Sequence, residues 1–318
     1  MILITGGMGF IGLHTARAFI DAGEEVVLMH FRTWRLPDFL QTEVGTRLHA
    51  LYAEPVDLVR GLALLDVLRK HHVTGIVHLA APAALGPDPA EQYWSATQGL
   101  VNVLEAARQQ GVARVSVASS VAVYHGSGAG PWREDRPLPV ESDSYTSAMK
   151  KAIEILALHF ADRTALDVRV LRLATIYGPL YRSMSNLPSR LCHAAVSGTQ
   201  PDLDSRGART PYAEDTVDLL YVRDCASAIT LLHRAAHLRH RVYNVGAGRA
   251  VTNGAIAEAV RRAVPGAAVT LPSHAPHADA PDAYMDVARL REDTGYASEY
   301  GVERGIAEYV AWLRDHPQ

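Results

Sequence analysis

The sequence predicts an α/β protein built on a doubly wound parallel sheet, with a smaller substrate-binding portion toward the C-terminus. Two observations indicate this fold. Short apolar strand patterns alternate with amphipathic helix patterns as far as residue 173, and such alternation is typical of a parallel sheet covered by helices on both faces. The first strand also runs into a glycine-rich turn that opens a helix, which is typical of a nucleotide-binding βαβ unit.

The glycine-rich turn is the strongest local signal in the chain. The first strand ends before Gly6, Gly9 and Gly12, and a helix over residues 10–22 follows. Glycines at this spacing permit a tight turn, close approach of the backbone to a pyrophosphate, and close packing of helix on strand. We therefore expect this segment to bind a dinucleotide through Gly6, Gly9, Phe10, Ile11 and Gly12.

The second strand, over residues 25–30, ends where such sites usually place a carboxylate for the ribose 2′-hydroxyl. His30 takes that place, and Arg32 and Arg35 follow. Because a missing carboxylate and added cations suit a 2′-phosphate, the sequence predicts NADP(H) as the preferred cofactor, with NAD(H) as the alternative. The two arginines can also be read as a solvated loop face.

The next elements continue the alternation. Strands are predicted over residues 48–52, 75–79 and 112–118, and helices over residues 57–72 and 91–110. The ligand of a parallel sheet lies across the carboxyl ends of its strands. Ala80 and Ala81 follow Leu79 at such an end, and their small side chains let a cofactor lie against the backbone, although plain close packing is the alternative.

Polar and aromatic residues follow the strand over residues 112–118. A Gly/Ser/Pro-rich loop over residues 127–139 leads to a helix over residues 144–161, and a strand over residues 168–173 comes next. This region supplies side chains expected around the nicotinamide and the substrate: Ser120, Tyr124, Lys150, Leu173 and Thr175.

The alternation loosens after Leu180. Helices are predicted near residues 185–197, 224–236, 253–263 and 301–314. We interpret residues 1–179 mainly as the dinucleotide-binding domain and residues 180–318 mainly as the substrate-binding portion, with residues 212–250 returning partly to the first sheet.

Composition argues against several classes of function. The net charge is −3, with Lys and Arg scattered, so neither nucleic acid nor an anionic membrane surface is expected as a partner. Apolar runs are shorter than the ~20 residues of a membrane span. Cys192 and Cys225 are the only cysteines, which fits a reducing, cytoplasmic setting. His233, His237 and His240 have helical spacing but no carboxylate or thiol beside them, so no metal is predicted.

Several motifs occur in one order along nearly the whole chain. They are residues 5–12, His78-Leu79-Ala80-Ala81, Ser119-Ser120 with Val123-Tyr124, Arg172 with Tyr177-Gly178-Pro179, Val222-Arg223-Asp224 and residues 242–248. Together they resemble the extended short-chain dehydrogenase/reductase superfamily, in its NAD-dependent epimerase/dehydratase group. The resemblance implies a seven-stranded Rossmann domain, a small C-terminal substrate domain and hydride transfer by NAD(P). It also implies proton chemistry by a Ser or Thr, here Ser120, with a Tyr and a Lys four residues after that Tyr.

The expected tyrosine is displaced. Tyr145 and Lys150 are five residues apart, and positions five apart on a helix diverge by about 140°, whereas positions four apart share a face. Lys150 therefore shares its face with Thr146, whose hydroxyl is a poor proton donor. We interpret Thr146 as holding the acid position; the alternative is a deformed helix start that lets Tyr145 serve. Lys150 can still hold the nicotinamide ribose and place charge beside a developing alkoxide.

The resemblance also implies two arginines for a substrate diphosphate. Val217 and Asp279 stand at their places, with Arg206 or Arg209 as substitutes, and Thr175 stands where an Asn is expected. Because diphosphate recognition depends on charge-assisted Arg contacts, these departures disfavour a nucleotide sugar.

The sequence is therefore interpreted as an NADPH-dependent ketoreductase of an aromatic, polyketide-type ketone, with a proton from water, from Ser120 through a relay or from a substrate hydroxyl. The departures narrow the resemblance to ketoreductases of antibiotic biosynthesis, of the simocyclinone (angucyclinone) type. Two alternatives stay open: a nucleotide-sugar 4-epimerase or dehydratase using Tyr145, and a non-enzymatic NADP(H)-sensing module. The oligomeric state is also open, with a homodimer as one option.

Overall fold

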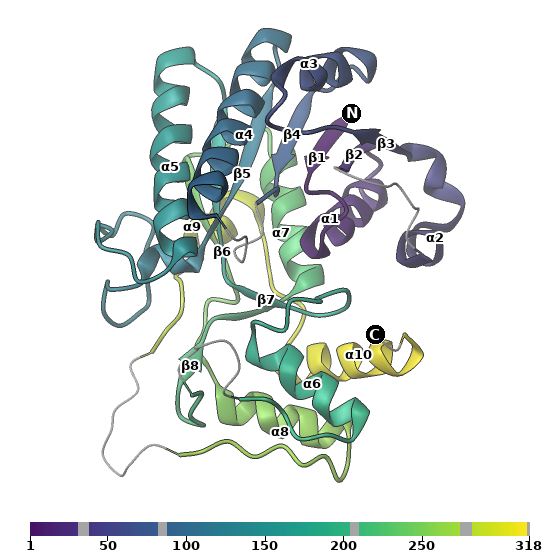
Figure 1. The fold of residues 1–318 in the computed structure, drawn as a ribbon, viewed down its shortest axis with the longest axis vertical. Coiled ribbons are helices and arrows are strands. Elements are labelled where there is room, and N and C mark those ends of the chain that lie inside the picture. The colour runs from purple at the N-terminus through teal and green to yellow at the C-terminus, as the bar shows by residue number, and fades with distance from the viewer. Residues whose placement is uncertain (31–37, 82–87, 204–209, 274–281, 317–318) are drawn as a thin grey trace.

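The computed structural model describes residues 1–30, 38–81, 88–203, 210–273 and 282–316. A seven-stranded sheet forms its centre, in the order β10-β6-β5-β4-β1-β2-β3 (Figure 1). Its strands are β1 (Ile2–Thr5), β2 (Val26–His30), β3 (Leu51–Pro55), β4 (Gly75–His78), β5 (Arg114–Ser120), β6 (Val168–Leu173) and β10 (Val242–Val245). Each neighbouring pair is parallel, so the predicted α/β architecture with a doubly wound sheet is confirmed.

Helices cover both faces of the sheet because successive strand residues point to opposite sides. Ile2 and Ile4 belong to one core cluster, and Leu3 belongs to another. The first cluster includes residues of α1 (Phe10–Asp21), α2 (Asp38–Val44), α7 (Val222–Arg234) and α9 (Ala288–Thr294). The second includes residues of α3 (Gly61–Lys70), α4 (Pro89–Gln110) and α5 (Tyr145–Thr164). Two apolar layers therefore hold the parallel strands between them.

A third core cluster lies outside the main sheet. It joins α6 (Leu187–Ser197), α8 (Asn253–Ala263) and α10 (Val302–Asp315), which gather at one end of the sheet (Figure 1). Two small sheets accompany them: β7 (Thr175–Tyr177) with β9 (Leu219–Tyr221), and β8 (Thr216–Val217) with β11 (Val251–Thr252). The chain then returns to the main sheet, where β10 pairs with β6 and Asn244 stands beside Arg172.

Some elements differ from the prediction. The third strand begins at Leu51 rather than at residue 48, because the 3₁₀ helix η1 (Gly45–Ala50) precedes it. The fifth strand extends to Ser120 and continues into the 3₁₀ helix η2 (Val121–Tyr124). The sequence analysis missed α2 and α9, which have 7 residues each and are too short for a helical period to be recognised.

A buried polar network connects α5 with the strands. Arg172 on β6 pairs with Glu154 on α5 at 2.8 Å, and each side chain is only 5% exposed. Glu154 also accepts a hydrogen bond of 2.5 Å from Ser119. Arg172 donates to the Tyr124 hydroxyl at 2.7 Å, and that hydroxyl donates to Asn244 Oδ1 at 2.8 Å. The charges of this interior ion pair are therefore matched by hydrogen bonds, which a buried pair requires.

Candidate active site

A cavity of about 600 Å³ opens at the carboxyl ends of the strands. Its wall brings together predicted site residues from distant segments: Gly6, Gly9, Phe10, Ile11, Gly12, Leu79, Ser120, Thr146, Lys150, Leu173 and Thr175. A second cavity of about 490 Å³ shares Gly6, Gly9 and Leu79 with the first. The two cavities therefore meet at the glycine turn, an arrangement that suits an extended dinucleotide.

The glycine turn fits a pyrophosphate because its glycines cannot carry side chains. Gly6 has a φ of +66°, and a Cβ there would lie 2.8 Å from Ala80 N. A Cβ on Gly12 would lie 2.7 Å from the Cα of Gly7. Gly9 precedes α1 and has no capping side chain, which leaves the first helical N–H groups for an anion.

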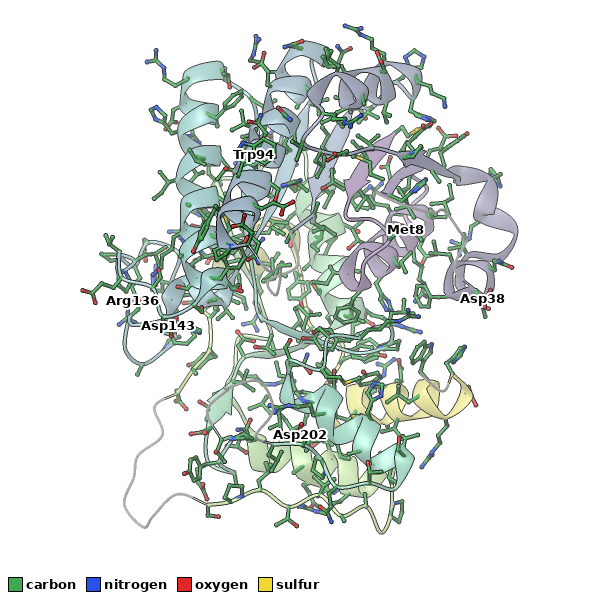
Figure 2. All side chains as sticks on the ribbon, in the orientation of Figure 1. Met8, Asp38, Trp94, Arg136, Asp143 and Asp202 are labelled. Carbon is green, nitrogen blue, oxygen red and sulfur yellow. The ribbon has the colours of Figure 1, made fainter. Side chains whose placement is uncertain are left out.

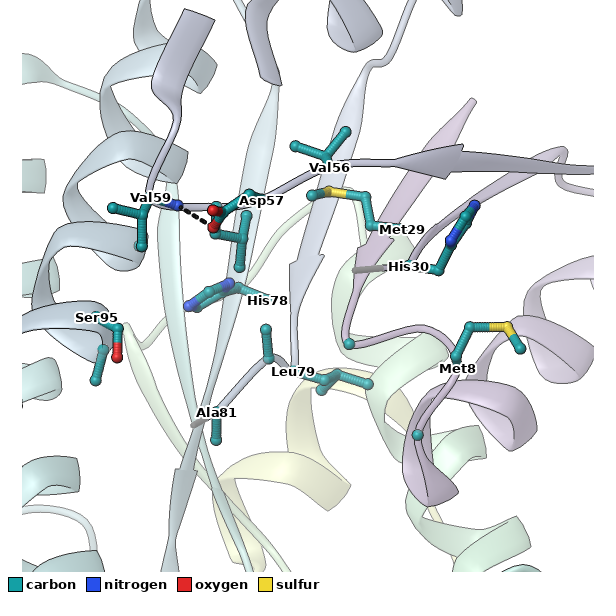
Figure 3. A pocket seen from close by; sticks show the side chains of 16 residues that line it. Met8, Met29, His30, Val56, Asp57, Val59, His78, Leu79, Ala81 and Ser95 are labelled. Atoms are coloured by element: carbon teal, nitrogen blue, oxygen red, sulfur yellow. Dashed lines mark hydrogen bonds between the residues drawn. The ribbon is translucent and has the colours of Figure 1, made fainter. Parts of the chain in front are cut away.

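The second cavity is lined by apolar side chains and by the polar side chains of His30, Asp57, His78 and Ser95 (Figure 3). Gly6, Gly9, His30, Leu79, Ala80 and Ala81 are among its residues, so it takes in six of the predicted cofactor residues. Asp57, which the sequence analysis did not single out, lies after β3 and accepts a hydrogen bond of 3.1 Å from Val59 N. Its carboxylate can also accept from an exocyclic amine. The sequence signal that could have identified Asp57 is a carboxylate shortly after the end of a strand. The predicted Arg32 and Arg35 lie outside the described residues.

His78 separates this cavity from the interior of the sheet. Its Nδ1 lies 2.8 Å from the Thr5 hydroxyl, and the Thr5 oxygen also accepts from Ala80 N at 3.3 Å. Desolvation and, to a smaller extent, the charge of Lys150 lower the pKa of His78 to about 3. The imidazole is therefore neutral and helps to fix the chain that follows β4.

The start of α5 separates Tyr145 from Thr146. Ser144 caps the helix by accepting a hydrogen bond of 3.3 Å from Ser147 N. The Tyr145 ring packs edge-to-face on Tyr93 of α4, with ring centroids 5.1 Å apart, and its hydroxyl donates to Gln92 O at 3.4 Å. Thr146 lines the first cavity, whereas Tyr145 is absent from its wall. The structure thus places the threonine, rather than the tyrosine, beside Lys150.

Lys150 and Ser120 supply the polar groups on the β5 side of the cavity. Lys150 Nζ donates to Ala118 O at 2.6 Å, and desolvation lowers the pKa of this lysine to about 8. Below that pH the ammonium is charged and can stabilise a developing alkoxide. Ser120 Oγ accepts a hydrogen bond of 3.2 Å from Ala122 N, which leaves its own proton to donate.

Tyr124 does not join the site. Its side chain is fully buried, and it is missing from the wall of the first cavity. Its ring stacks on Trp132 with centroids 5.5 Å apart, and its hydroxyl is bonded to Arg172 and Asn244. The substrate contact predicted for Tyr124 therefore does not match the structure, because η2 turns this ring into the core.

His125, which follows Tyr124, lines the first cavity and was not singled out from the sequence. Its Nδ1 lies 3.1 Å from Asp143 Oδ1. The two residues are far apart in the sequence and lie on loops, so no periodic pattern brings them together. Only the fold reveals this pair.

Within the described ranges, no three His, Cys, Asp or Glu residues form a group that can hold a metal ion. His233 is buried, and its Nδ1 lies 2.8 Å from the Ser116 hydroxyl. In the same parts of the chain, no helix is long and apolar enough to cross a membrane.

The fold and the two cavities define an extended short-chain dehydrogenase/reductase. The family model "NAD dependent epimerase/dehydratase family" matches residues 2–246. The chain therefore belongs to the NAD-dependent epimerase/dehydratase family, as its motifs predicted.

The names of its relatives refer to nucleotide sugars. UDP-arabinose 4-epimerase 1 of Arabidopsis thaliana is 26% identical over 99% of this chain and 80% of its own length. dTDP-glucose 4,6-dehydratase of Streptomyces griseus is 27% identical over 99% of this chain and 94% of its own. The solved structure of MoeE5 with UDP-glucuronic acid and NAD is 29% identical, covers 99% of both chains and has a TM-score of 0.78.

These relatives correct the predicted function. The interpretation as a ketoreductase of a polyketide-type ketone is wrong, since the related proteins are nucleotide-sugar epimerases and dehydratases. They give no support to the narrower simocyclinone-type resemblance, to a ketone substrate or to a homodimer. The wrong prediction was drawn from the absence of arginines at Val217 and Asp279 and from the displaced tyrosine. The MoeE5 structure contains NAD. It agrees with the predicted class of cofactor, a nicotinamide dinucleotide, whereas the predicted preference for NADP(H) is not shown.

Proposed function

We propose that this chain is an NAD(P)-dependent enzyme that acts on a nucleotide-activated sugar, with 4-epimerisation as its reaction. The observation that carries the proposal is the cavity that brings the glycine turn together with Ser120, Thr146 and Lys150. The names of the relatives support the substrate class. When bound, the dinucleotide supplies the centre that takes up and returns a hydride.

The composition of the cavity wall favours epimerisation over dehydration. Loss of water from a hexose requires an acid and a base at the carbons where the bond breaks, in addition to those at C4. Among the described residues that line the first cavity, none is Asp or Glu. Epimerisation needs only one proton acceptor at the C4 oxygen, which also returns the proton.

The residues of the wall have separate tasks. Ser120 donates a hydrogen bond to the C4 oxygen, and Lys150 stabilises negative charge there. Leu173 contributes apolar surface, which limits the water around the reacting carbon. Val217, on β8, supplies no cation for the diphosphate; Arg206 and Arg209 lie outside the described residues.

The test is product analysis after incubation with UDP-glucose, UDP-glucuronate, UDP-arabinose and dTDP-glucose. NMR of a sugar carrying deuterium at C4 separates the reactions, because an epimerase keeps the label at C4 and a dehydratase moves it to C6. We expect a 4-epimer with retained label. A protein that binds neither the dinucleotide nor any of these sugars contradicts the proposal.

The cofactor preference is a separate question. His30 and the two arginines that follow it predict a 2′-phosphate site, so NADP(H) remains the predicted cofactor. Titration of the cofactor-free protein with NAD⁺ and NADP⁺ compares the affinities, and Arg32→Ala should weaken NADP⁺ alone. Equal weakening of both, or tighter binding of NAD⁺, contradicts the preference.

Two predictions about the whole chain belong to this proposal. The division into residues 1–179 and 180–318, with residues 212–250 returning to the first sheet, is supported by the pairing of β10 with β6. A cytoplasmic location is supported by Cys192 and Cys225, which are buried and unpaired.

A further inference from the structure

The proposed reaction needs a group that takes the proton from the C4 hydroxyl of the sugar. Thr146 stands beside Lys150, but its hydroxyl is too weakly acidic for this exchange. Lys150 has a pKa of about 8 and is therefore mostly charged at neutral pH, so it cannot accept a proton there. Among the described residues of the first cavity, the other titratable side chains are His125 and Tyr181.

His125 is oriented by a carboxylate. It follows η2, and Asp143 immediately precedes the residue that caps α5. Figure 2 shows Asp143 at the start of α5, near the loop that carries Arg136. The distance from His125 Nδ1 to Asp143 Oδ1 is 3.1 Å. The hydrogen bond from His125 lowers the pKa of Asp143, although desolvation opposes it.

The ionised Asp143 fixes the tautomer of the imidazole. A carboxylate only accepts hydrogen bonds, so Nδ1 of His125 carries a proton and donates it to Asp143. In the tautomer with the proton on Nδ1, the lone pair lies on Nε2. Within the described part of the chain, the imidazole of His125 has no hydrogen-bond partner besides Asp143, which leaves Nε2 to bind a ligand in the cavity.

We propose that His125 is the proton acceptor and donor of this site and that Asp143 is its positioning residue. This inference rests on the proposed epimerisation. When C4 is oxidised, the C4 O–H bond breaks and Nε2 takes the proton, and the dinucleotide, when bound, would accept the hydride from C4. When C4 is reduced again, Nε2 returns the proton to the oxygen, and the dinucleotide would return the hydride to the other face of C4. Electrons and protons balance, and no other reactant is consumed.

Tyr181 is the competing group, and its contacts place it elsewhere. Its hydroxyl is hydrogen-bonded to the Ser185 hydroxyl. Its ring packs edge-to-face on Phe10 at the start of α1, with centroids 5.1 Å apart. That position faces the pyrophosphate turn, whereas His125 lies between the end of β5 and the start of α5, beside Ser120.

The kinetic experiment uses the full chain with its dinucleotide. In His125→Ala we expect kcat for the epimerised nucleotide sugar to fall at least ~100-fold, with KM changed less than about 2-fold. Added imidazole should restore part of the rate, because the pair is open to solvent. Asp143→Asn should lower kcat, and Asp143→Glu should recover much of it. His71→Ala is the matched control, since His71 pairs with Glu54 at 2.6 Å outside the first cavity.

Two readouts separate this inference from the proposed function. Calorimetry should show unchanged dinucleotide binding in His125→Ala, and nitrogen NMR should show the Nδ1–H tautomer in the wild type but not in Asp143→Asn. If the wild type converts no nucleotide sugar, the proposed function fails. The His125 tautomer measured by nitrogen NMR still tests whether Asp143 orients the imidazole. If the wild type is active, full activity of His125→Ala, a loss that imidazole does not restore, or a large loss only in Tyr181→Phe overturns the inference.

Discussion

Replacing Tyr145 by Phe should leave the reaction intact. The phenol oxygen lies 3.4 Å from Gln92 O and outside the cavity wall, so the change removes one long hydrogen bond worth at most about 1 kcal/mol of stability. A residue that transfers a proton contributes ~10²–10⁴ in rate, or about 3–5 kcal/mol. The expected effect of Tyr145→Phe on kcat is less than about 2-fold, far below that range.

Thr146→Val is the matched variant, because it removes a hydroxyl that does line the cavity. Loss of one neutral hydrogen bond to the substrate should lower kcat/KM by about 2–10-fold. The assay is the rate of 4-epimer formation followed by NMR, with bound dinucleotide quantified for each variant. A loss of ~100-fold or more in Tyr145→Phe, with Thr146→Val unaffected, would refute the placement of these two side chains.

Three further predictions concern charge, shape and stability. Because a lysine is charged below its pKa, which is about 8 for Lys150, kcat should fall as pH rises through about 8, and Lys150→Met should abolish that limb; an unchanged profile would contradict this role. Gly12→Ala should raise the dinucleotide Kd at least ~10-fold, because the added Cβ would clash with the backbone of Gly7. A fluorescence titration that shows equal affinity would argue against dinucleotide binding at the glycine turn. Glu154→Ala should cost about 3–5 kcal/mol of unfolding free energy in urea, and adding Arg172→Met should recover most of it, since an unpaired buried charge is the main penalty; equal losses in both variants would disprove that origin.

The sequence predicted the elements whose patterns are local and long. The strand, glycine turn and helix at the start of the chain follow from spacing alone, as does the regular helix that carries Lys150. The edge strand β3 was misplaced, because its burial is incomplete and a half-exposed strand has a weak apolar pattern.

The site was only partly accessible from the sequence. Helical geometry favoured Thr146 over Tyr145 as the neighbour of Lys150, and the structure has the same arrangement. Asp57 and His125 could not be found in this way, because each depends on loops that the fold brings to a cavity. Tyr124 was misassigned because a motif gives the residue type but not the direction of its ring.

The error in function has a different origin. The ketoreductase interpretation was built on residues that are missing from expected places, and an absent contact says little about which substrate replaces it. The residues that are present, above all the glycine turn and Ser120, agreed with the family throughout.

The hydrogen bond between Tyr124 and Asn244 has a consequence for synthesis. When residues up to 179 have left the ribosome, β6 still lacks its outer neighbour, and the Tyr124 hydroxyl lacks Asn244 as a partner. Both are supplied by β10, after α6 and α7 have been translated. The nascent chain therefore keeps an open sheet edge at β6 until β10 has emerged.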